Sequence, residues 1–440
     1  MPRILQGPLK RALIVENPHE SIDEMLIEAG FEVERLDFSP DAEQLGEILS
    51  AGGHQVLFKR SRVPVTKEVI EKAKDLVAIQ LCCIGDDSVD KAACADAGVL
   101  VFNDPVSNGR SVVELVIGHL IGLSRQLFET FRSTHAGVWE KSATARYEIH
   151  GKVLGVYGLG RIGRATARAA QTFGMKILFW DTREVAIEVG EEMGWTKAES
   201  PLELFSNSDA VSMHVSATDA EGRDNSMLIT KELFMALGRD MGDNSPRLFI
   251  NLARGVIYDP ADLIEAIEAG AVKRAAVDVF PVEPGNNTKD WGNPFSGEFR
   301  VATTPHIGAA TQEAQPRIAR RVVNTSLAYS NLGAIRDCVL SPKTKIALTE
   351  SLLDNKTILL VVHSTERGTK KALDDAIYEA NADNLMSTHR DFSMWGVAVN
   401  VNLLDRPLNE KQLKDIVVRT TSVTGDNNAV RLIRQITNES

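Results

Sequence analysis

Short apolar runs alternate with longer amphipathic segments along the first hundred residues. Short apolar runs favour buried strands, and apolar positions spaced three or four apart favour helices. This order predicts a parallel α/β sheet with crossover helices. The predicted elements are strands at 11–15, 31–36, 56–59, 76–81 and 98–102, with an amphipathic helix at 22–29.

The period changes after residue 110. Residues 111–131 form a long, largely apolar helical pattern, and Ser111 with Glu114 would open it as a capping box. A second series of strands and helices begins at residue 152. Its predicted elements are strands at 153–157, 177–180, 210–214, 248–251, 275–279 and 301–304, with helices at 164–173 and from Asp259-Pro260 to about Gly270.

The last part of the chain changes character again. Residues 313–332 have a helical pattern, and a loose segment to about residue 355 resembles a linker. The tail, 357–436, reads strand, helix, strand, helix, strand, and is short enough to be one small module. Polar residues enlarge two loops of the second series, at 219–225 and 238–246, and the polar segment 281–299, rich in glycine and asparagine, is predicted to be a loop.

Length and charge limit the class of protein. A chain of 440 residues is too long for one core and predicts two or three domains. The 49 basic and 60 acidic residues give a net charge of -11, which argues against nucleic acid or an anionic membrane as partner. An anionic substrate would need a local basic pocket. We find no apolar run of membrane-spanning length and expect a cytoplasmic protein.

The four cysteines have neither metal-finger nor redox spacing. We interpret Cys82, Cys83, Cys94 and Cys338 as buried thiols in a reducing compartment.

A glycine-rich turn joins a predicted strand to a predicted helix at Gly158-Leu159-Gly160-Arg161-Ile162-Gly163. In a dinucleotide site, such glycines allow a tight turn, close approach of a pyrophosphate and close helix packing. Asp181 ends the next strand, at the offset expected for a carboxylate on the ribose 2′-hydroxyl. The pair predicts NAD rather than NADP, although Arg183 would soften that discrimination. The alternative is a plain strand-to-helix turn with a solvated aspartate.

Three charged residues follow predicted strands at the same edge of this sheet, where α/β sheets bind ligands. Arg254 offers a fork that fits a carboxylate, and His306 titrates near neutrality and suits a general acid/base. Glu283, beside the imidazole, would fix its tautomer and stabilise its charged form. Taken singly, a surface arginine, a loop glutamate and a helix-capping histidine explain them equally well.

The order and spacing of three segments resemble the catalytic blocks of the D-2-hydroxyacid dehydrogenases: Asn251-Leu-Ala-Arg254-Gly255, Asp278-Val-Phe-Pro-Val-Glu283-Pro284 and Thr304-Pro305-His306-Ile-Gly308. The resemblance runs from about residue 8 to 335. It implies that Arg254 binds the substrate carboxylate, that Glu283 assists, and that His306 is the acid/base. It also implies a cofactor site that adds Asp278, Arg161, Ile162, His214, Val215 and Ala253 to the glycines and Asp181, although a structural role for His214 is equally open.

The same resemblance implies the domain order. A flavodoxin-like substrate domain (1–107) would be interrupted by a Rossmann-type NAD domain (108–299) and completed by a return segment (300–340). A linker and a small α+β domain (341–440) would follow. The family also implies a cleft closed by a hinge, and a homodimer or homotetramer built largely through the cofactor domains.

A basic loop, Lys59-Arg60-Ser61-Arg62, stands at a strand end in the first domain and suits a phosphate, although a solvated loop is the alternative. Segments 83–90, 103–111 and Trp139-Glu140-Lys141 resemble the substrate loops of phosphoglycerate dehydrogenases within the family. By that resemblance Arg60, Ser61, Arg62 and Lys141 surround a phosphate, and Ser107 and Asn108 contact the carboxylate side. Asp86 and Asp87 depart from the pattern by adding negative charge.

The tail resembles, at low similarity, the ACT domain that binds serine in many phosphoglycerate dehydrogenases. Its first turn, 363–368, keeps His363 and Gly368, but Thr365 and Arg367 stand where an amide and a proline usually occur. A threonine hydroxyl cannot reproduce the donor and acceptor of an amide. We therefore expect a module that pairs subunits and binds serine weakly or not at all; a purely structural appendage is equally open.

The sequence leaves three functions open. The leading hypothesis is NAD-dependent oxidation of 3-phosphoglycerate to 3-phosphohydroxypyruvate, the first step of serine biosynthesis. The second is a dehydrogenase for another acid, such as 2-hydroxyglutarate or glycerate. The third is an NAD-sensing binding protein, against which the complete set of Arg254, Glu283 and His306 argues.

Overall fold

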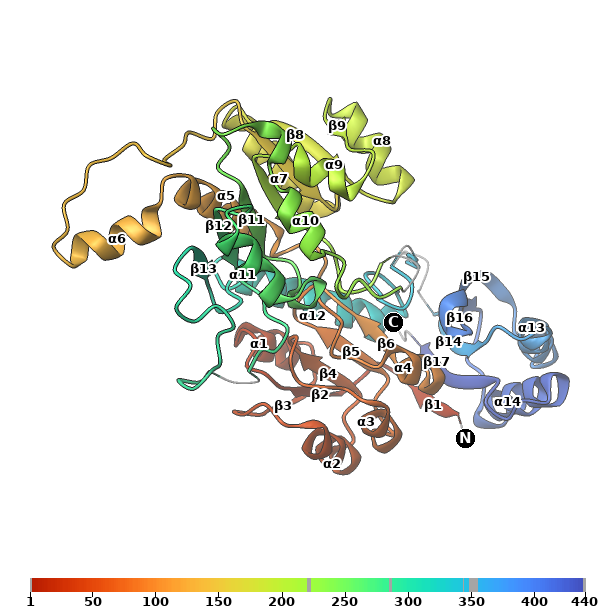
Figure 1. Ribbon diagram of the computed structural model, residues 1–440. Coiled ribbons are helices and arrows are strands. Elements are labelled where there is room, and N and C mark those ends of the chain that lie inside the picture. The colour runs from red at the N-terminus through yellow and green to blue at the C-terminus, as the bar shows by residue number, and fades with distance from the viewer. Residues whose placement is uncertain (1, 220–222, 285–286, 343, 348–354, 438–440) are drawn as a thin grey trace. The chain divides into compact units, whose positions relative to one another are not determined.

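The computed structural model describes residues 2–219, 223–284, 287–342, 344–347 and 355–437 (Figure 1). The chain divides into two compact units. The terminal unit comprises Met1–Pro105 and Gln315–Ser440, and the central unit is Val106–Ala314. The sequence placed the return to the first domain at residue 300. The structure places it at 314, because the strand at Val301–Thr303 pairs with the sheet of the central unit.

The first part of the terminal unit is a five-stranded parallel sheet in the order β3-β2-β4-β5-β6. This is the 2-1-3-4-5 order of flavodoxin-like folds. Its strands are β2 (Arg11–Ile14), β3 (Glu32–Arg35), β4 (Val56–Lys59), β5 (Ala78–Leu81) and β6 (Leu100–Phe102). Its helices are α1 (Ser21–Glu28), α2 (Ala42–Gly52), α3 (Lys67–Lys72), α4 (Lys91–Ala97) and the returning α12 (Ala314–Leu332).

The second part of the terminal unit is a mostly antiparallel sheet in the order β1-β17-β14-β16-β15. Its elements are β1 (Arg3–Gln6), β14 (Thr357–Ser364), α13 (Thr369–Glu379), β15 (Asn384–Phe392), β16 (Val397–Leu404), α14 (Glu410–Thr424) and β17 (Val430–Thr437). The pattern predicted one strand between the two helices. The structure has a hairpin there, because a short 3-10 turn, Ser393–Trp395, and Gly396 interrupt the run.

Both ends of the chain contribute to this sheet, and it is bonded to the rest of the terminal unit. β1, from the start of the chain, pairs in parallel with β17, a pairing that the sequence pattern did not predict. The fully buried Arg434 donates to the carbonyls of Tyr329 and Ser330 at the end of α12, at 3.0 and 2.7 Å. The C-terminal module therefore packs as part of the terminal unit.

The central unit contains a seven-stranded parallel sheet in the order β13-β12-β11-β10-β7-β8-β9. The strands are β7 (Val153–Tyr157), β8 (Lys176–Trp180), β9 (Thr196–Lys197), β10 (Ala210–Met213), β11 (Leu248–Asn251), β12 (Arg274–Val277) and β13 (Val301–Thr303). The helices are α5 (Gly109–Ser124), α6 (Leu127–His135), α7 (Arg161–Thr172), α8 (Glu184–Glu192), α9 (Pro201–Ser206), α10 (Lys231–Ala236) and α11 (Pro260–Glu268).

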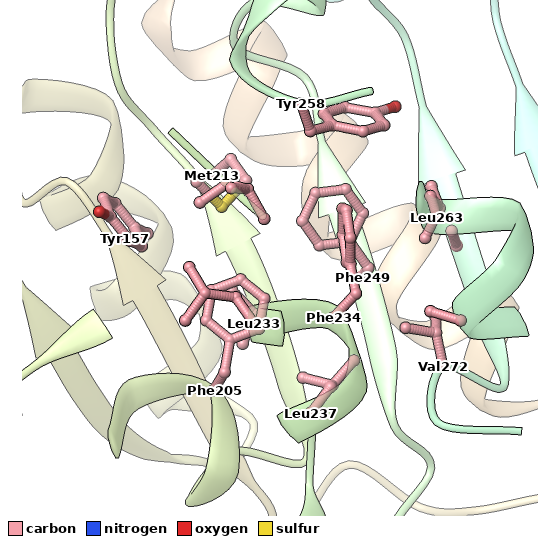
Figure 2. Close-up of a cluster of buried hydrophobic side chains, with 14 of the residues drawn as sticks. Tyr157, Phe205, Met213, Leu233, Phe234, Leu237, Phe249, Tyr258, Leu263 and Val272 are labelled. Carbon is pink, nitrogen blue, oxygen red and sulfur yellow. The ribbon is translucent and has the colours of Figure 1, made fainter. Parts of the chain in front are cut away.

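Apolar clusters cover both faces of this sheet. On one face, α9, α10 and α11 pack on the strands, and the rings of Phe234, Phe249 and Tyr258 meet edge to face (Figure 2). On the other face, α5 and α7 provide the cover. The strands are thereby fixed, and the loops at their carboxyl ends stand on a rigid base.

The long helix predicted over 111–131 is two helices, α5 and α6. Gln126 adopts a left-handed conformation (φ 55°) between them, and the pair is bent by 64°. Among the described residues no single helix meets the length and hydropathy of a membrane span; this bent pair does so by composition, although much of α5 is buried in the core.

The predicted capping box at Ser111 and Glu114 is wrong, because α5 begins at Gly109 and Ser111 lies inside it. The four cysteines form no disulfide with one another; Cys82, Cys94 and Cys338 are buried as predicted, whereas Cys83 is only half-buried. In the predicted polar loops, residues 220–222 and 285–286 lie outside the described residues. Much of the predicted linker, residues 343 and 348–354, lies outside them as well.

Candidate active site

The glycine turn after β7 forms a tight cradle, in which side chains would clash with the neighbouring backbone. Gly158 has a φ of 91°, and a Cβ there would lie 2.7 Å from the carbonyl oxygen of His214. A Cβ on Gly163 would lie 2.1 Å from the carbonyl oxygen of Gly158. Gly160 precedes α7 with no side chain on the first amides of the helix. The uncapped N-terminus of α7, reached through a turn of glycines without side chains, fits the pyrophosphate of a dinucleotide.

Asp181 lies directly after β8 and is buried at the edge of this cradle. Its carboxylate accepts hydrogen bonds from the amide of Leu159 at 2.7 Å and from the guanidinium of Arg183 at 2.7 and 3.0 Å. Burial raises the pKa of Asp181, but the bonds from Arg183 and Leu159 outweigh it and hold the pKa below its usual value. The carboxylate is therefore charged at neutral pH and repels a 2′-phosphate.

We expect Asp181→Ala to weaken NAD binding and to relax the discrimination against NADP, because the acceptor for the 2′-hydroxyl and the repelling charge are both lost. The measurement is kcat/KM with each cofactor for wild type and variant. An unchanged ratio of NAD to NADP would place the ribose contact elsewhere.

His214 follows β10 and forms a wall of the glycine cradle through its backbone carbonyl. Its ring nitrogen Nε2 lies 2.9 Å from the hydroxyl of Ser212, and burial lowers its pKa to about 4. The ring is thus neutral near pH 7. The structure places His214 beside the glycine turn, and its ring bonds to Ser212 of β10, the strand that it follows.

Arg254 is positioned by the turn that follows β11. The side chain of Asn251 donates to the carbonyl of Arg254 at 2.8 Å and accepts from the amide of Ala253 at 3.0 Å. Gly255 lets this turn approach the segment that follows β12, because a Cβ there would lie 2.0 Å from the carbonyl carbon of Phe280. Asn251 was not predicted as a site residue. What could have pointed to it is an asparagine directly at a predicted strand end.

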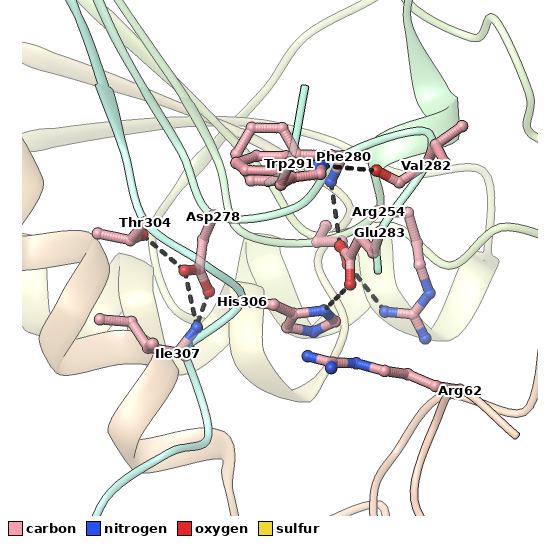
Figure 3. Close-up of polar contacts among 12 residues, drawn as sticks. Arg62, Arg254, Asp278, Phe280, Val282, Glu283, Trp291, Thr304, His306 and Ile307 are labelled. Atoms are coloured by element: carbon pink, nitrogen blue, oxygen red, sulfur yellow. Dashed lines mark hydrogen bonds and ion pairs between the residues drawn. The ribbon is translucent and has the colours of Figure 1, made fainter. Parts of the chain in front are cut away.

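His306 and Glu283 form the centre of the site (Figure 3). The Nδ1 of His306 lies 2.7 Å from Oε2 of Glu283, whose Oε1 accepts from the amide of Phe280 at 3.1 Å. With Nδ1 held by the carboxylate, Nε2 is the nitrogen available for a substrate proton. The imidazole keeps 38% of its side-chain surface exposed, so a small molecule can reach it.

Asp278 holds the loop that carries His306. Its carboxylate accepts from the Thr304 hydroxyl at 2.6 Å and from the amides of Ile307 and Gly308 at 2.8 Å each (Figure 3). His306 itself has a left-handed backbone (φ 54°), which this loop stabilises. Burial raises the pKa of Asp278, and the three donors oppose that shift. Asp278 thus acts on His306 through the backbone of the loop, and its predicted contact with the cofactor stays a prediction.

Together these residues stand at the carboxyl ends of neighbouring strands. Arg254 follows β11, Glu283 follows β12, and His306 follows β13. The arrangement offers a cation for a carboxylate and an acid/base for an adjacent hydroxyl.

The predicted substrate residues fall into three places. In the terminal unit, Arg60, Ser61 and the exposed Arg62 follow β4, whereas Lys59 is fully buried and is not part of the basic surface. The negative charge of Asp86 was expected to disfavour phosphate. Its carboxylate lies 3.2 Å from the ammonium of Lys91, which compensates that charge.

In the central unit, Ser107 and Asn108 precede α5. A Cβ on Gly109 would lie 3.7 Å from Ile162, so this helix start lies against the glycine turn. Lys141 lies elsewhere, in the exposed segment after α6, which projects from the central unit (Figure 1).

Comparisons with known proteins agree with this site. Residues 117–308 match the family model described as "D-isomer specific 2-hydroxyacid dehydrogenase, NAD binding domain". The D-3-phosphoglycerate dehydrogenase of Escherichia coli is 34% identical over 91% of this chain and 93% of its own. That of Haemophilus influenzae is 34% identical over 84% and 85%. The solved structure titled for the pyruvate reductase of Chlamydomonas reinhardtii has a TM-score of 0.60 at 25% identity, and covers 73% of this chain and 97% of its own.

Proposed function

Because the chain belongs to the D-2-hydroxyacid dehydrogenase family and is an NAD-dependent oxidoreductase, we propose that its substrate is 3-phosphoglycerate, oxidised at C2 to 3-phosphohydroxypyruvate. The observation that carries the choice of substrate is the pair of arginines, Arg60 and Arg62, on one loop of an acidic protein. The names of the 34% identical relatives support the same choice.

The residues of the site account for the reaction. Arg254 binds the C1 carboxylate and fixes C2 beside His306. Nε2 of His306 takes the C2 hydroxyl proton, and the imidazolium is stabilised by Glu283 through Nδ1. Bound NAD supplies the acceptor for the hydride that leaves C2 as the carbonyl forms. Asp278 keeps His306 in place throughout.

The test is turnover of purified protein with NAD on 3-phosphoglycerate, 2-hydroxyglutarate and glycerate. We expect kcat/KM for 3-phosphoglycerate to exceed that for glycerate, because only the former carries the phosphate that the basic loop reads. A higher kcat/KM for 2-hydroxyglutarate or glycerate would assign the enzyme to another acid. NADH binding without turnover of any acid would favour a sensing protein.

We also propose that the enzyme is a homo-oligomer joined through α6 and the segment after it. This arm, residues 127–141, exposes large apolar side chains that a protein without a partner would normally bury. Among them are Phe131, 64% exposed, and Trp139, 88% exposed. Its base is tied to the sheet by an ion pair of 2.6 Å between Glu129 and Arg274. A second copy of the chain would cover the arm and bring Lys141 to the partner's site.

We expect Phe131→Glu to shift the protein toward monomer in sedimentation, because a charge in a covered apolar contact is costly. Phe173→Glu, an exposed phenylalanine outside the arm, is the matched control. Equal masses for wild type and both variants would argue against the arm as interface.

The C-terminal module has the strand-helix-strand-strand-helix-strand order that supports an ACT-like assignment. His363 is the last but one residue of β14 and stacks on His389 with ring centroids 5.3 Å apart. Gly368, with a φ of 101°, is the N-cap of α13. Burial lowers the pKa of His363 to about 4, so the ring stays neutral near pH 7. Thr365 and Arg367 stand in the turn between these residues.

Millimolar L-serine should leave the oxidation rate nearly unchanged, because Thr365 lacks the paired donor and acceptor of an amide. The measurement is initial rate against serine concentration. Cooperative inhibition at micromolar serine would contradict this expectation.

A further inference from the structure

A buried lysine ends an apolar strand in the terminal unit. Lys59 is the last residue of β4, follows the buried Val56, Leu57 and Phe58, and has no exposed surface. A lysine is almost never fully buried unless it is paired. Its partner is Glu16, itself only 9% exposed, whose Oε2 lies 3.7 Å from the ammonium.

Each member of this pair also bonds to the backbone of the basic loop. The ammonium of Lys59 donates to the carbonyl oxygen of Arg60 at 2.9 Å. Oε1 of Glu16 accepts from the amide of Arg62 at 2.6 Å. The two charged side chains therefore hold the loop at both ends, on either side of Ser61.

The lysine reaches a second loop as well. Its ammonium donates to the hydroxyl of Ser88 at 2.7 Å, within the segment 83–90. The backbone of Ser88 accepts from the amide of Val65 at 2.8 Å, just beyond the basic loop. Lys59 thus fixes the basic loop relative to the neighbouring loop.

Stability alone does not explain the pair. Burying two charges costs several kcal/mol per ion, and replacing such a pair by apolar residues of similar size is often neutral or stabilising. Glu16 in addition has a left-handed backbone (φ 64°), a conformation that costs free energy for a residue with a side chain. The cost of burying the charges and the cost of the left-handed backbone therefore both fall on the two residues that hold the basic loop.

We propose that Glu16 and Lys59 are positioning residues, which fix the backbone of Arg60 and Arg62 so that both guanidinium groups are preorganised for one anionic group of the substrate. This inference rests on the proposed function, in which that group is the phosphate of 3-phosphoglycerate. An arginine fork binds phosphate with two directed bonds, so the direction of each side chain matters as well as its charge. Preorganisation avoids ordering the loop when the substrate binds.

The experiment replaces both charges with apolar side chains of similar length, in Glu16→Met/Lys59→Met. Removing both avoids leaving one charge buried alone, so we expect the double variant to fold with a melting temperature near that of wild type. Its KM for 3-phosphoglycerate should rise about tenfold, the scale of a lost charge-assisted hydrogen bond. The KM for NAD, the KM for glycerate and kcat should stay within about twofold.

Leu49→Ala is the control for a purely structural role. Leu49, on α2, is buried in an apolar cluster that also contains Leu57 of β4, and the change leaves a cavity. It should lower the melting temperature and keep the ratio of kcat/KM between 3-phosphoglycerate and glycerate. Amide hydrogen exchange of the peptide that covers Arg62 should quicken in the double variant and not in Leu49→Ala.

The outcomes separate the two proposals. Wild-type protein with no preference for 3-phosphoglycerate over glycerate would overturn the proposed function. A wild-type preference that the folded double variant retains, with unchanged exchange at Arg62, would overturn the positioning role alone.

Discussion

Replacing His306 with alanine should lower kcat for hydroxyacid oxidation by about two to four orders of magnitude, the usual loss when a general acid/base is removed. Glu283 holds Nδ1 of the imidazole at 2.7 Å, and 38% of the side-chain surface of His306 is exposed to a substrate. The measurement is steady-state turnover, with NADH binding as the control for an intact cofactor site.

NADH should bind the His306→Ala variant nearly as tightly as wild type, because the glycine cradle and Asp181 do not depend on the imidazole. Near-normal turnover would show that another group moves the proton. A variant that has lost NADH binding would show that the 304–308 loop, held by Asp278, has collapsed, and His306→Gln would then replace it.

Arg62→Ala should raise KM for 3-phosphoglycerate by about ten- to a hundredfold, the effect of losing a hydrogen bond between two charged groups. KM for glycerate should change little, because glycerate has no phosphate. Arg62→Lys keeps the charge but not the fork, and should fall between wild type and Arg62→Ala. Equal losses for both substrates would mean that the loop does not read phosphate.

Local patterns were sufficient to predict the strand, turn and helix of the candidate cofactor site. The spacing of Gly158, Gly160 and Gly163 requires only a strand, a turn and a helix, and these lie next to one another in the sequence. Asp181 follows at the end of the next strand, as expected for a parallel sheet. The strand ends that carry Arg254, Glu283 and His306 were predicted because a buried parallel strand is a clear apolar run.

The contacts that hold these residues in place could not be predicted from the pattern of apolar and polar positions. Asp278 was predicted to face the cofactor, and its bonds to Thr304, Ile307 and Gly308 depend on β12 and β13 being neighbours. In the sequence, Lys59 looks like one more cation of a basic loop. Its burial depends on an ion pair with Glu16, which follows the neighbouring strand β2.

Two of the failures of element prediction come from contacts between residues distant in the sequence. Ser111 has the residue type of a helix cap, but the chain enters α5 two residues earlier, where Gly109 packs on Ile162. The pairing of β1 with β17 joins the two ends of the chain, and no local pattern reports so distant a partner.

The most direct test of the account follows the hydrogen at C2. Wild-type protein is given NAD and 3-phosphoglycerate with deuterium at C2, and the NADH formed is isolated and its mass measured. The account predicts NADH that carries the deuterium, because the hydride passes directly from C2 to the cofactor. Unlabelled NADH, or none at all from this substrate, would contradict it.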